Sequence, residues 1–234
     1  MVDIHTHVLP RIDDGPEKLE DSLHLIKTLV DTGVTNIVST SHYYSENISF
    51  DSFIGRRARR LDEVRQSIRE YNIPVNIISG AEVNISRLLL NLDSLKDLCF
   101  ENTNRILLEI PHRETNLEKA LDLIEKIVSY YNVVPVVAHV ERYNFFSKKM
   151  KNLNYLKEMG CIIQVDAHCL FERFGQKRFV LKAIDEGLVD VVASDCHDTD
   201  TRPPNLADAY AVISKKLGEQ AVQMLKDNAE QLIK

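Results

Sequence analysis

Seven short apolar runs in this chain each end at, or one residue before, an aspartate, glutamate or histidine. Runs of this length and β-branched content are typical of strands that are buried on both faces, as in a parallel sheet. We therefore expect seven parallel strands with polar side chains at their carboxyl ends. The expected strands are Val2–Ile4, Asn36–Ser41, Val75–Ala81, Ile106–Leu108, Val133–Ala138, Cys161–Val165 and Val189–Ser194.

Helical patterns of apolar residues alternate with these strands. The first expected helix begins at Pro16, a residue type tolerated at the first helical position, and ends at Gly33. The second begins at Asp51 as its N-cap and carries an apolar stripe as far as Ile68. Further helices are expected over residues 86–98, 115–131, 148–159, 178–186, 205–217 and 219–233.

The regular alternation of strand and helix, with no linker between them, predicts a single domain over residues 1–234. Parallel strands joined by helices close into a barrel in the TIM fold, which has eight strands. Because we expect seven strands, the sequence predicts an α/β fold, a distorted (β/α)7 TIM-like barrel.

The carboxyl ends of barrel strands meet at one mouth, where such folds place their active sites. His5 and His7 are two residues apart in a strand, so their imidazoles point to one face, and Asp195 and His197 are paired likewise if the chain stays extended there. A single His-x-His pair arises easily by chance, so the prediction depends on the number of imidazoles and carboxylates that converge. This mixed ligand set suits Mn, Fe or Zn, and we expect a polynuclear metal site.

The composition narrows the possible functions. The 234 residues carry a formal net charge of -6, which argues against a general nucleic-acid or anionic-membrane binder. No apolar stretch approaches the roughly 20 residues that span a bilayer, and no export signal is recognisable before the first strand. The four cysteines form no CxxC pair, which suits a reducing compartment. We expect a cytoplasmic protein without membrane insertion or nucleic-acid binding, and the oligomeric state stays open.

Several motifs, in order along the chain, match a known family. They are Asp3-Ile4-His5-Thr6-His7, Asp13-Asp14-Gly15-Pro16, Ser39-Thr40-Ser41-His42, Gly80-Ala81-Glu82, Ala138-His139-Val140-Glu141-Arg142-Tyr143, Ala193-Ser194-Asp195-Cys196-His197 and Arg202-Pro203-Pro204. On these motifs the whole chain resembles the polymerase-and-histidinol-phosphatase (PHP) superfamily. Within that superfamily it is most similar to the metal-dependent protein-tyrosine phosphatases of bacterial capsule and exopolysaccharide operons, the CpsB/CapC type.

The resemblance implies about three metal ions, usually Mn²⁺, with Fe or Zn as alternatives. The implied ligands of the first ion are His5, His7, Glu82 and Asp195, with Glu82 bridging to the second. The implied ligands of the second ion are Glu82, Glu109 and His139, and those of the third are Asp14, His42 and His197.

The resemblance also implies a reaction and a partner. Arg142 and Arg202 lie on ligand-bearing loops, and a planar guanidinium can hold two phosphate oxygens at once, so they are expected as catalytic residues. The implied substrate is phosphotyrosine on a partner tyrosine autokinase. Its hydrolysis would regulate capsular or exopolysaccharide biosynthesis.

Other residues in or near these motifs are expected to have supporting or structural roles. Asp13 either caps the turn before Asp14 or is a further ligand. Asp166 is expected to support a ligand rather than to be one, and Cys196 is expected to be a core thiol. His168 lies on a loop at the mouth, with no ligand role expected. The arginine cluster 56–60 is either a solvated helix face or a docking site for an acidic phosphopeptide.

Two other functions stay open at this point. One is a small-molecule phosphoesterase of the same superfamily, such as histidinol-phosphate phosphatase, although the short loops favour an open mouth. Another is a non-catalytic regulatory module that keeps metals for structure. An amidohydrolase also has a His-x-His motif and a final aspartate, but it usually has a bridging carboxylated lysine where this chain has Glu82.

Overall fold

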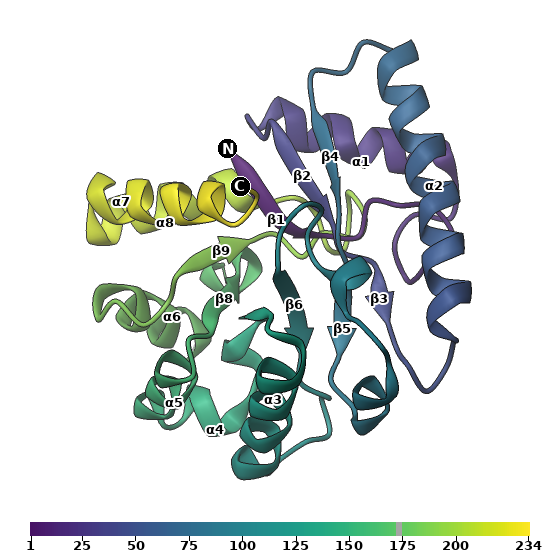
Figure 1. The fold of residues 1–234 in the computed structure, drawn as a ribbon. Helices are drawn as coiled ribbons and strands as arrows, with labels where there is room; N and C mark the ends of the chain where they lie inside the picture. Colours follow the sequence, from purple (N-terminus) through teal and green to yellow (C-terminus); the bar gives the residue numbers. More distant parts are fainter. Residues whose placement is uncertain (172–174) are drawn as a thin grey trace.

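The structure is a computed structural model that describes residues 1–171 and 175–234. Strands lie at its centre with helices around them, and the two chain ends lie near each other (Figure 1). Each of the seven expected runs contains a strand, and every described pairing between strands is parallel. The strands are β1 (Val2–Thr6), β2 (Asn36–Ser39), β3 (His42–Tyr43), β4 (Asn76–Ser79), β5 (Glu82–Asn84), β6 (Arg105–Glu109), β7 (Val134–Val137), β8 (Ile162–Asp166) and β9 (Val191–Ala193).

Two of the expected strands are interrupted near their carboxyl ends. β2 resumes as β3 at His42, and β4 resumes as β5 at Glu82. At the second interruption the backbone passes very close to its neighbour, since a Cβ atom on Gly80 would lie 2.9 Å from Cγ1 of Val38. Only glycine permits this approach. The interruptions place His42 and Glu82 directly opposite each other as register partners.

The described strands form two parallel sheets. The three-stranded sheet has the order β1-β2-β4, and the six-stranded sheet has the order β3-β5-β6-β7-β8-β9. Near β1, the N–H of Asp195 donates to the carbonyl of His5 and the N–H of His7 donates to the carbonyl of Cys196, both at 2.9 Å. The expected α/β fold with parallel strands is therefore confirmed, as two sheets that approach each other beyond the end of β9.

Both sheets contribute to one buried apolar core. Its members include Ile4 of β1 and Leu107 of β6, together with Ala229 and Leu232 near the carboxyl end of the chain. On β1 the core residue Ile4 is followed by His5, and on β6 Leu107 is followed after one residue by Glu109. The apolar core therefore ends where the candidate ligands begin.

The helices lie outside the strands (Figure 1). They are α1 (Leu19–Asp31), α2 (Phe50–Glu70), α3 (Leu117–Tyr131), α4 (Asn144–Ser147), α5 (Leu153–Glu158), α6 (Gln176–Asp185), α7 (Leu206–Leu217) and α8 (Glu219–Gln231). None of the helices within residues 1–171 and 175–234 combines the length and the apolar character that crossing a bilayer requires.

Several predicted helix boundaries are wrong. α1 begins at Leu19 rather than Pro16, because the preceding residues form a turn in which the N–H of Gly15 donates to Asp13 Oδ1 at 3.1 Å. α2 begins one residue before Asp51, and its N-cap is Ser49, whose hydroxyl accepts the N–H of Ser52.

Two predicted helices are broken into shorter pieces. Residues 86–98 form the 3₁₀ helices η1 (Arg87–Asn91) and η2 (Lys96–Leu98), because Leu92 has an extended backbone (φ -82°, ψ 146°) that ends the first one. Residues 148–159 are divided between η4 (Met150–Asn152) and α5.

Candidate metal centre

Four buried side chains converge at the carboxyl ends of β1 and β9 and the start of β5. His5 Nε2 lies 3.2 Å from Glu82 Oε2 and 3.2 Å from Asp195 Oδ1. His7 Nε2 lies 3.3 Å from each of the same two oxygens and 3.3 Å from His5 Nε2. Atoms spaced in this way match the edges of a tetrahedral shell with ligand distances of about 2.0 Å, as in protein metal sites.

The other ring nitrogens of these histidines are held by polar side chains. His5 Nδ1 lies 3.3 Å from Gln164 Oε1, and His7 Nδ1 lies 2.8 Å from Asp13 Oδ2. Each of these oxygens accepts a hydrogen bond from Nδ1–H, so we assign the tautomer that leaves the Nε2 lone pair free to coordinate. Partners of this kind orient metal-binding histidines and raise their basicity.

The carboxylate of Glu82 faces two groups of ligands at once. Its Oε2 lies near His5 and His7, and also 2.9 Å from His42 Nδ1. Its Oε1 lies 2.9 Å from His139 Nε2, which is 3.7 Å from Glu109 Oε1. A carboxylate in this position can bridge two ions.

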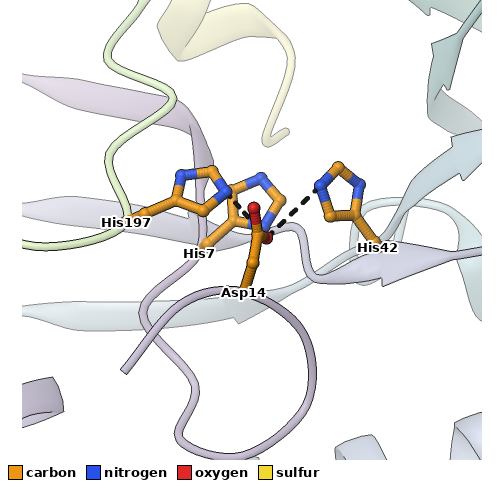
Figure 2. A group of neighbouring side chains, drawn as sticks. All are labelled: His7, Asp14, His42 and His197. Atoms are coloured by element: carbon orange, nitrogen blue, oxygen red, sulfur yellow. Dashed lines mark ion pairs between the residues drawn. The ribbon is translucent and has the colours of Figure 1, made fainter. Parts of the chain in front are cut away.

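A third group contains His7, Asp14, His42 and His197, which come from separate segments and point toward one another (Figure 2). Asp14 Oδ1 lies 3.0 Å from His197 Nε2 and 3.5 Å from His42 Nε2. His197 Nδ1 donates to the carbonyl of Asp195 at 3.0 Å, which again leaves Nε2 to face the cluster. The structure thus brings all of the expected ligands together, and it adds His7 to the third group.

The charges in the cluster are strongly coupled. Burial lowers the pKa of His5, but the carboxylates of Glu82 and Asp195 outweigh burial and raise it to about 9. Burial raises the pKa of Glu82, but the surrounding histidines hold it well below its usual value. Protons and a cation would therefore compete for the same buried atoms.

Several buried polar atoms of the cluster fit a metal ion. Glu82 Oε2, Asp195 Oδ1 and His197 Nε2 are buried and make no hydrogen bond of good geometry within the described residues, although other candidate ligands lie within ion-pair distance of each. Such an atom costs about 1–3 kcal/mol when nothing satisfies it. Coordination would satisfy these atoms, and a donor set of imidazole nitrogen and carboxylate oxygen suits Mn, Fe or Zn.

Both expected catalytic arginines contact the same carboxylate oxygen. Asp195 Oδ2 lies 2.5 Å from Arg142 Nη2 and 2.8 Å from Arg202 Nη2, whereas Oδ1 faces His5 and His7. Both arginines line a cavity of about 350 Å³ together with the candidate ligands Asp14, His42, Glu82 and Glu109. The arginines therefore hold one candidate ligand and also border this cavity.

Backbone strain accompanies two of the ligands. His139 and Asp195 have positive φ angles of 36° and 51°, which non-glycine residues adopt rarely. The chain is therefore not extended at Asp195, contrary to the condition placed on its pairing with His197. The side chains of Asp195 and His197 nevertheless both reach the cluster. Cys196, which lies between them in the sequence, is a buried core thiol as expected.

Three residues of the site were missed or left open by the sequence. Gln164 is buried, and its Oε1 accepts the N–H of His139 at 2.9 Å as well as the proton of His5. Tyr44 Oη lies 3.3 Å from His42 Nδ1. Asp13 supports His7 instead of only capping the turn. A single glutamine or tyrosine gives no signal in the sequence until its neighbours in space are known.

Other residues lie around this site. Asp166 accepts from Gln164 Nε2 at 3.0 Å and pairs with Arg142, which fits the supporting role expected for it. His168 lines a neighbouring cavity of about 170 Å³ that shares both arginines with the first. The solvated-face interpretation of residues 56–60 is wrong for Arg57, whose buried guanidinium donates to the carbonyls of Gly80 (2.8 Å) and Asp97 (2.6 Å).

Parallel strands with imidazoles and carboxylates gathered at their ends define an α/β protein with a candidate polynuclear metal centre. A family model described as "Capsular polysaccharide synthesis, CpsB/CapC" matches residues 1–234. The chain belongs to this family, which confirms the resemblance found in its motifs.

Curated relatives cover the full chain. It is 33% identical to the tyrosine-protein phosphatase CpsB of Streptococcus agalactiae, over 100% of this chain and 98% of the relative. It is 28% identical to the tyrosine-protein phosphatase YwqE of Bacillus subtilis, over 100% of this chain and 92% of the relative. The alignments span nearly the whole of each relative.

Solved structures agree with this assignment. Crystal structures of YwqE from Bacillus subtilis and CpsB from Streptococcus pneumoniae, described as metal-dependent tyrosine phosphatases, include a chain that matches with a TM-score of 0.85. That match has 28% identity and covers 100% of this chain and 94% of the other. Histidinol phosphate phosphatase from Lactococcus lactis matches with a TM-score of 0.54 and 14% identity, over 97% and 92% of the two chains, which shows a shared fold.

Proposed function

We propose that this protein is a metal-dependent protein-tyrosine phosphatase. Its family and the activity named for its relatives support the reaction. The observation that carries the proposal is the position of Glu82, whose Oε2 faces His5 and His7 while its Oε1 faces His139. One carboxylate thus spans two candidate metal positions, and phosphatases are among the hydrolases that use paired metal ions.

The metal centre of this proposal has about three Mn²⁺ ions, with Fe or Zn as alternatives. The proposed ligands are His5, His7, Glu82 and Asp195 for the first ion, Glu82, Glu109 and His139 for the second, and Asp14, His42 and His197 for the third. Groups of possible ligand atoms within 4.8 Å of one another contain the ligands proposed for the first and third ions. The group near the second ion contains His42, Glu82 and Glu109. His139 is assigned to the second ion because its Nε2 lies 2.9 Å from Glu82 Oε1 and 3.7 Å from Glu109 Oε1. When bound, the ions would lower the pKa of water toward neutrality and neutralise the phosphoryl oxygens.

The residues of the chain would position the substrate. Arg142 and Arg202 each point one guanidinium nitrogen at Asp195 Oδ2, and their remaining N–H groups can donate to the peripheral oxygens of the phosphoryl group. Preorganised donors of this kind stabilise the charge of the transition state. The leaving phenolate has a pKa of about 10, so it can depart without a strong general acid.

A cysteine nucleophile has no part in this proposal. All four cysteines are buried. Burial raises the pKa of Cys99 to about 11 and that of Cys161 to about 12, and it also raises the pKa of Cys196. Protonated, buried thiols are poor nucleophiles, so thiol alkylation is not expected to inhibit the reaction.

We also propose a domain organisation, a partner and a cellular location for the enzyme. We infer a single PHP phosphatase domain over residues 1–234, with the two sheets acting as one distorted (β/α)7 barrel. The apolar core shared by both sheets supports this inference. The proposed partner is a phosphotyrosine-bearing bacterial tyrosine kinase that controls capsular or exopolysaccharide synthesis. The proposed location is the cytoplasm, where free thiols stay reduced.

Metal removal and reconstitution test the proposal. Protein purified without chelators should contain about three transition-metal ions per chain by elemental analysis. Stripping with a chelator should abolish hydrolysis of a phosphotyrosyl peptide, and added Mn²⁺ should restore it. Hydrolysis that persists in the stripped protein would overturn the metal dependence, and a reconstituted protein without phosphotyrosyl turnover would overturn the reaction.

A further inference from the structure

A third cavity lies directly beside the candidate metal centre. Its volume is about 420 Å³, within the range of roughly 300–1,000 Å³ that is usual for ligand pockets. It shares Asp14, His42 and Tyr44 with the cavity bordered by the two arginines. A chain whose phosphotyrosine occupies the metal centre would therefore pass next to this cavity, which we call the side groove.

Away from the candidate ligands, the side groove has three apolar wall residues beside the polar residues Asn47 and Arg56. Ile12, Ile48 and Phe53 line it, from the loop after β1, the loop after β3 and helix α2. Phe53 is buried, whereas Ile12 and Ile48 remain half-buried. Large aliphatic side chains that border a cavity can gain further burial when an apolar group enters.

The charged groups of the side groove are mostly engaged already. Asp13 pairs with His7 and Asp14 pairs with His197. Arg56, at the rim, donates to the carbonyl of Arg11 and has no carboxylate partner among the described residues. The groove therefore offers apolar walls and one free positive charge, which complements a phosphopeptide of net negative charge better than a basic one.

From this geometry we infer that the side groove is a specificity site, which takes a large apolar side chain flanking the phosphotyrosine of the substrate protein. This inference rests on the proposed phosphatase function and adds a sequence preference to it. Arg56 would contribute long-range attraction for the anionic peptide, and Ile12 and Ile48 would contact the apolar side chain.

A peptide panel tests the preference. One peptide carries phosphotyrosine among glycines, and the others carry a single leucine at one of the neighbouring positions on either side. At least one leucine peptide should exceed the glycine peptide in kcat/KM by about tenfold or more, the scale of a filled apolar subsite. Equal kcat/KM across the panel would overturn the inference while leaving the phosphatase function intact. Failure to hydrolyse every peptide and p-nitrophenyl phosphate would instead overturn the proposed function.

Substitutions of two residues that line the side groove test whether the peptide preference arises there. Ile48→Ser and Ile12→Ser should each reduce the ratio of kcat/KM between the best leucine peptide and the glycine peptide to about one. The matched control Met224→Ser, which changes an exposed apolar residue of α8, should keep the wild-type ratio. The ratio is insensitive to a general loss of active enzyme. A wild-type ratio in both wall variants would overturn the inference.

The role of the Arg56 charge at the rim of the side groove is tested separately, with Arg59 as the matched control. Arg56→Glu should raise KM for the leucine peptide several-fold at low salt, because it reverses the free charge of the groove. Arg59→Glu makes the same change in net charge on the same helix at a residue that does not line the groove. Equal KM values for the two variants would show that the rim charge has no local role, against the inference.

Discussion

Asp13 Oδ2 lies 2.8 Å from His7 Nδ1, and the same oxygen accepts the backbone N–H of His42 at 2.9 Å. One carboxylate therefore orients two candidate metal ligands from separate strands. Histidine outweighs the burial of this carboxylate and holds the pKa of Asp13 well below its usual value, so it stays ionised. Asp13 is thus a positioning residue for the metal centre.

Substitution of Asp13 should weaken metal binding. Asp13→Asn keeps a hydrogen-bond acceptor but removes the charge that fixes the His7 tautomer, so the affinity for Mn²⁺ should fall by about 10–100-fold. Competition with a fluorescent chelator measures this affinity. Asp51→Asn, at an exposed position near the start of α2, is the matched control and should bind Mn²⁺ as the wild type does. Wild-type affinity in Asp13→Asn would show that the pair is incidental.

Alanine substitutions at Glu82 and His168 should differ sharply in their effects on activity and metal content. Glu82→Ala removes the carboxylate that faces both groups of ligands, so activity should be abolished and metal content should fall. His168→Ala changes an exposed residue of the neighbouring cavity and should lose much less. Elemental analysis and kcat/KM for a phosphotyrosyl peptide measure both effects. Equal and severe losses at the two positions would contradict the separation of ligand from bystander.

The two arginines should affect catalysis more than metal content. Arg142→Ala or Arg202→Ala should lower kcat/KM by about 10²-fold or more, the scale of one lost transition-state contact. Metal content should persist, because the arginines contact Asp195 Oδ2 and leave Oδ1 facing the histidines. Lysine should restore only part of the rate, since an ammonium cannot make the bidentate fork. Wild-type kinetics in both alanine variants would show that the two arginines only form ion pairs and have no catalytic role.

Buried Asp3 should make stability depend on pH. Burial raises its pKa from 3.8 to about 6, so between these values the native state holds a proton that the unfolded state has released. The free energy of unfolding therefore falls as pH rises through this window, and the difference corresponds to about 3 kcal/mol. Asp3→Asn keeps the acceptor for the N–H of Ser194 and removes the titration.

Chemical denaturation of the metal-free protein at several pH values measures this effect. Asp3→Asn and wild type should be similar in stability near pH 4, and the variant should be more stable above pH 6. Asp21→Asn, at an exposed position in α1, should follow the wild type at every pH. A constant difference between Asp3→Asn and wild type would contradict the assigned titration.

The sequence predicted the strands, and the candidate ligands that converge at their carboxyl ends, for one physical reason. A doubly buried strand needs a continuous apolar run, and a ligand must follow it at the carboxyl end, so His5 and Glu109 stand out in the sequence. The prediction of one helix over residues 86–98 is wrong because Leu92 adopts an extended backbone. Leucine favours helices, so the residue type gives no indication of this break. Gln164 could not be found, because its role depends on contacts with His5 and His139 that only the fold creates.

Substrate preference tests the central claim most directly. Steady-state kcat/KM should be measured on one preparation of Mn²⁺-loaded protein with a phosphotyrosyl peptide, the corresponding phosphoseryl peptide and histidinol phosphate. A metal-dependent protein-tyrosine phosphatase should turn over the phosphotyrosyl peptide well above the other two, because its phenolate leaves more readily than an alkoxide. A clear preference for histidinol phosphate would contradict the account and identify a small-molecule phosphoesterase on the same fold.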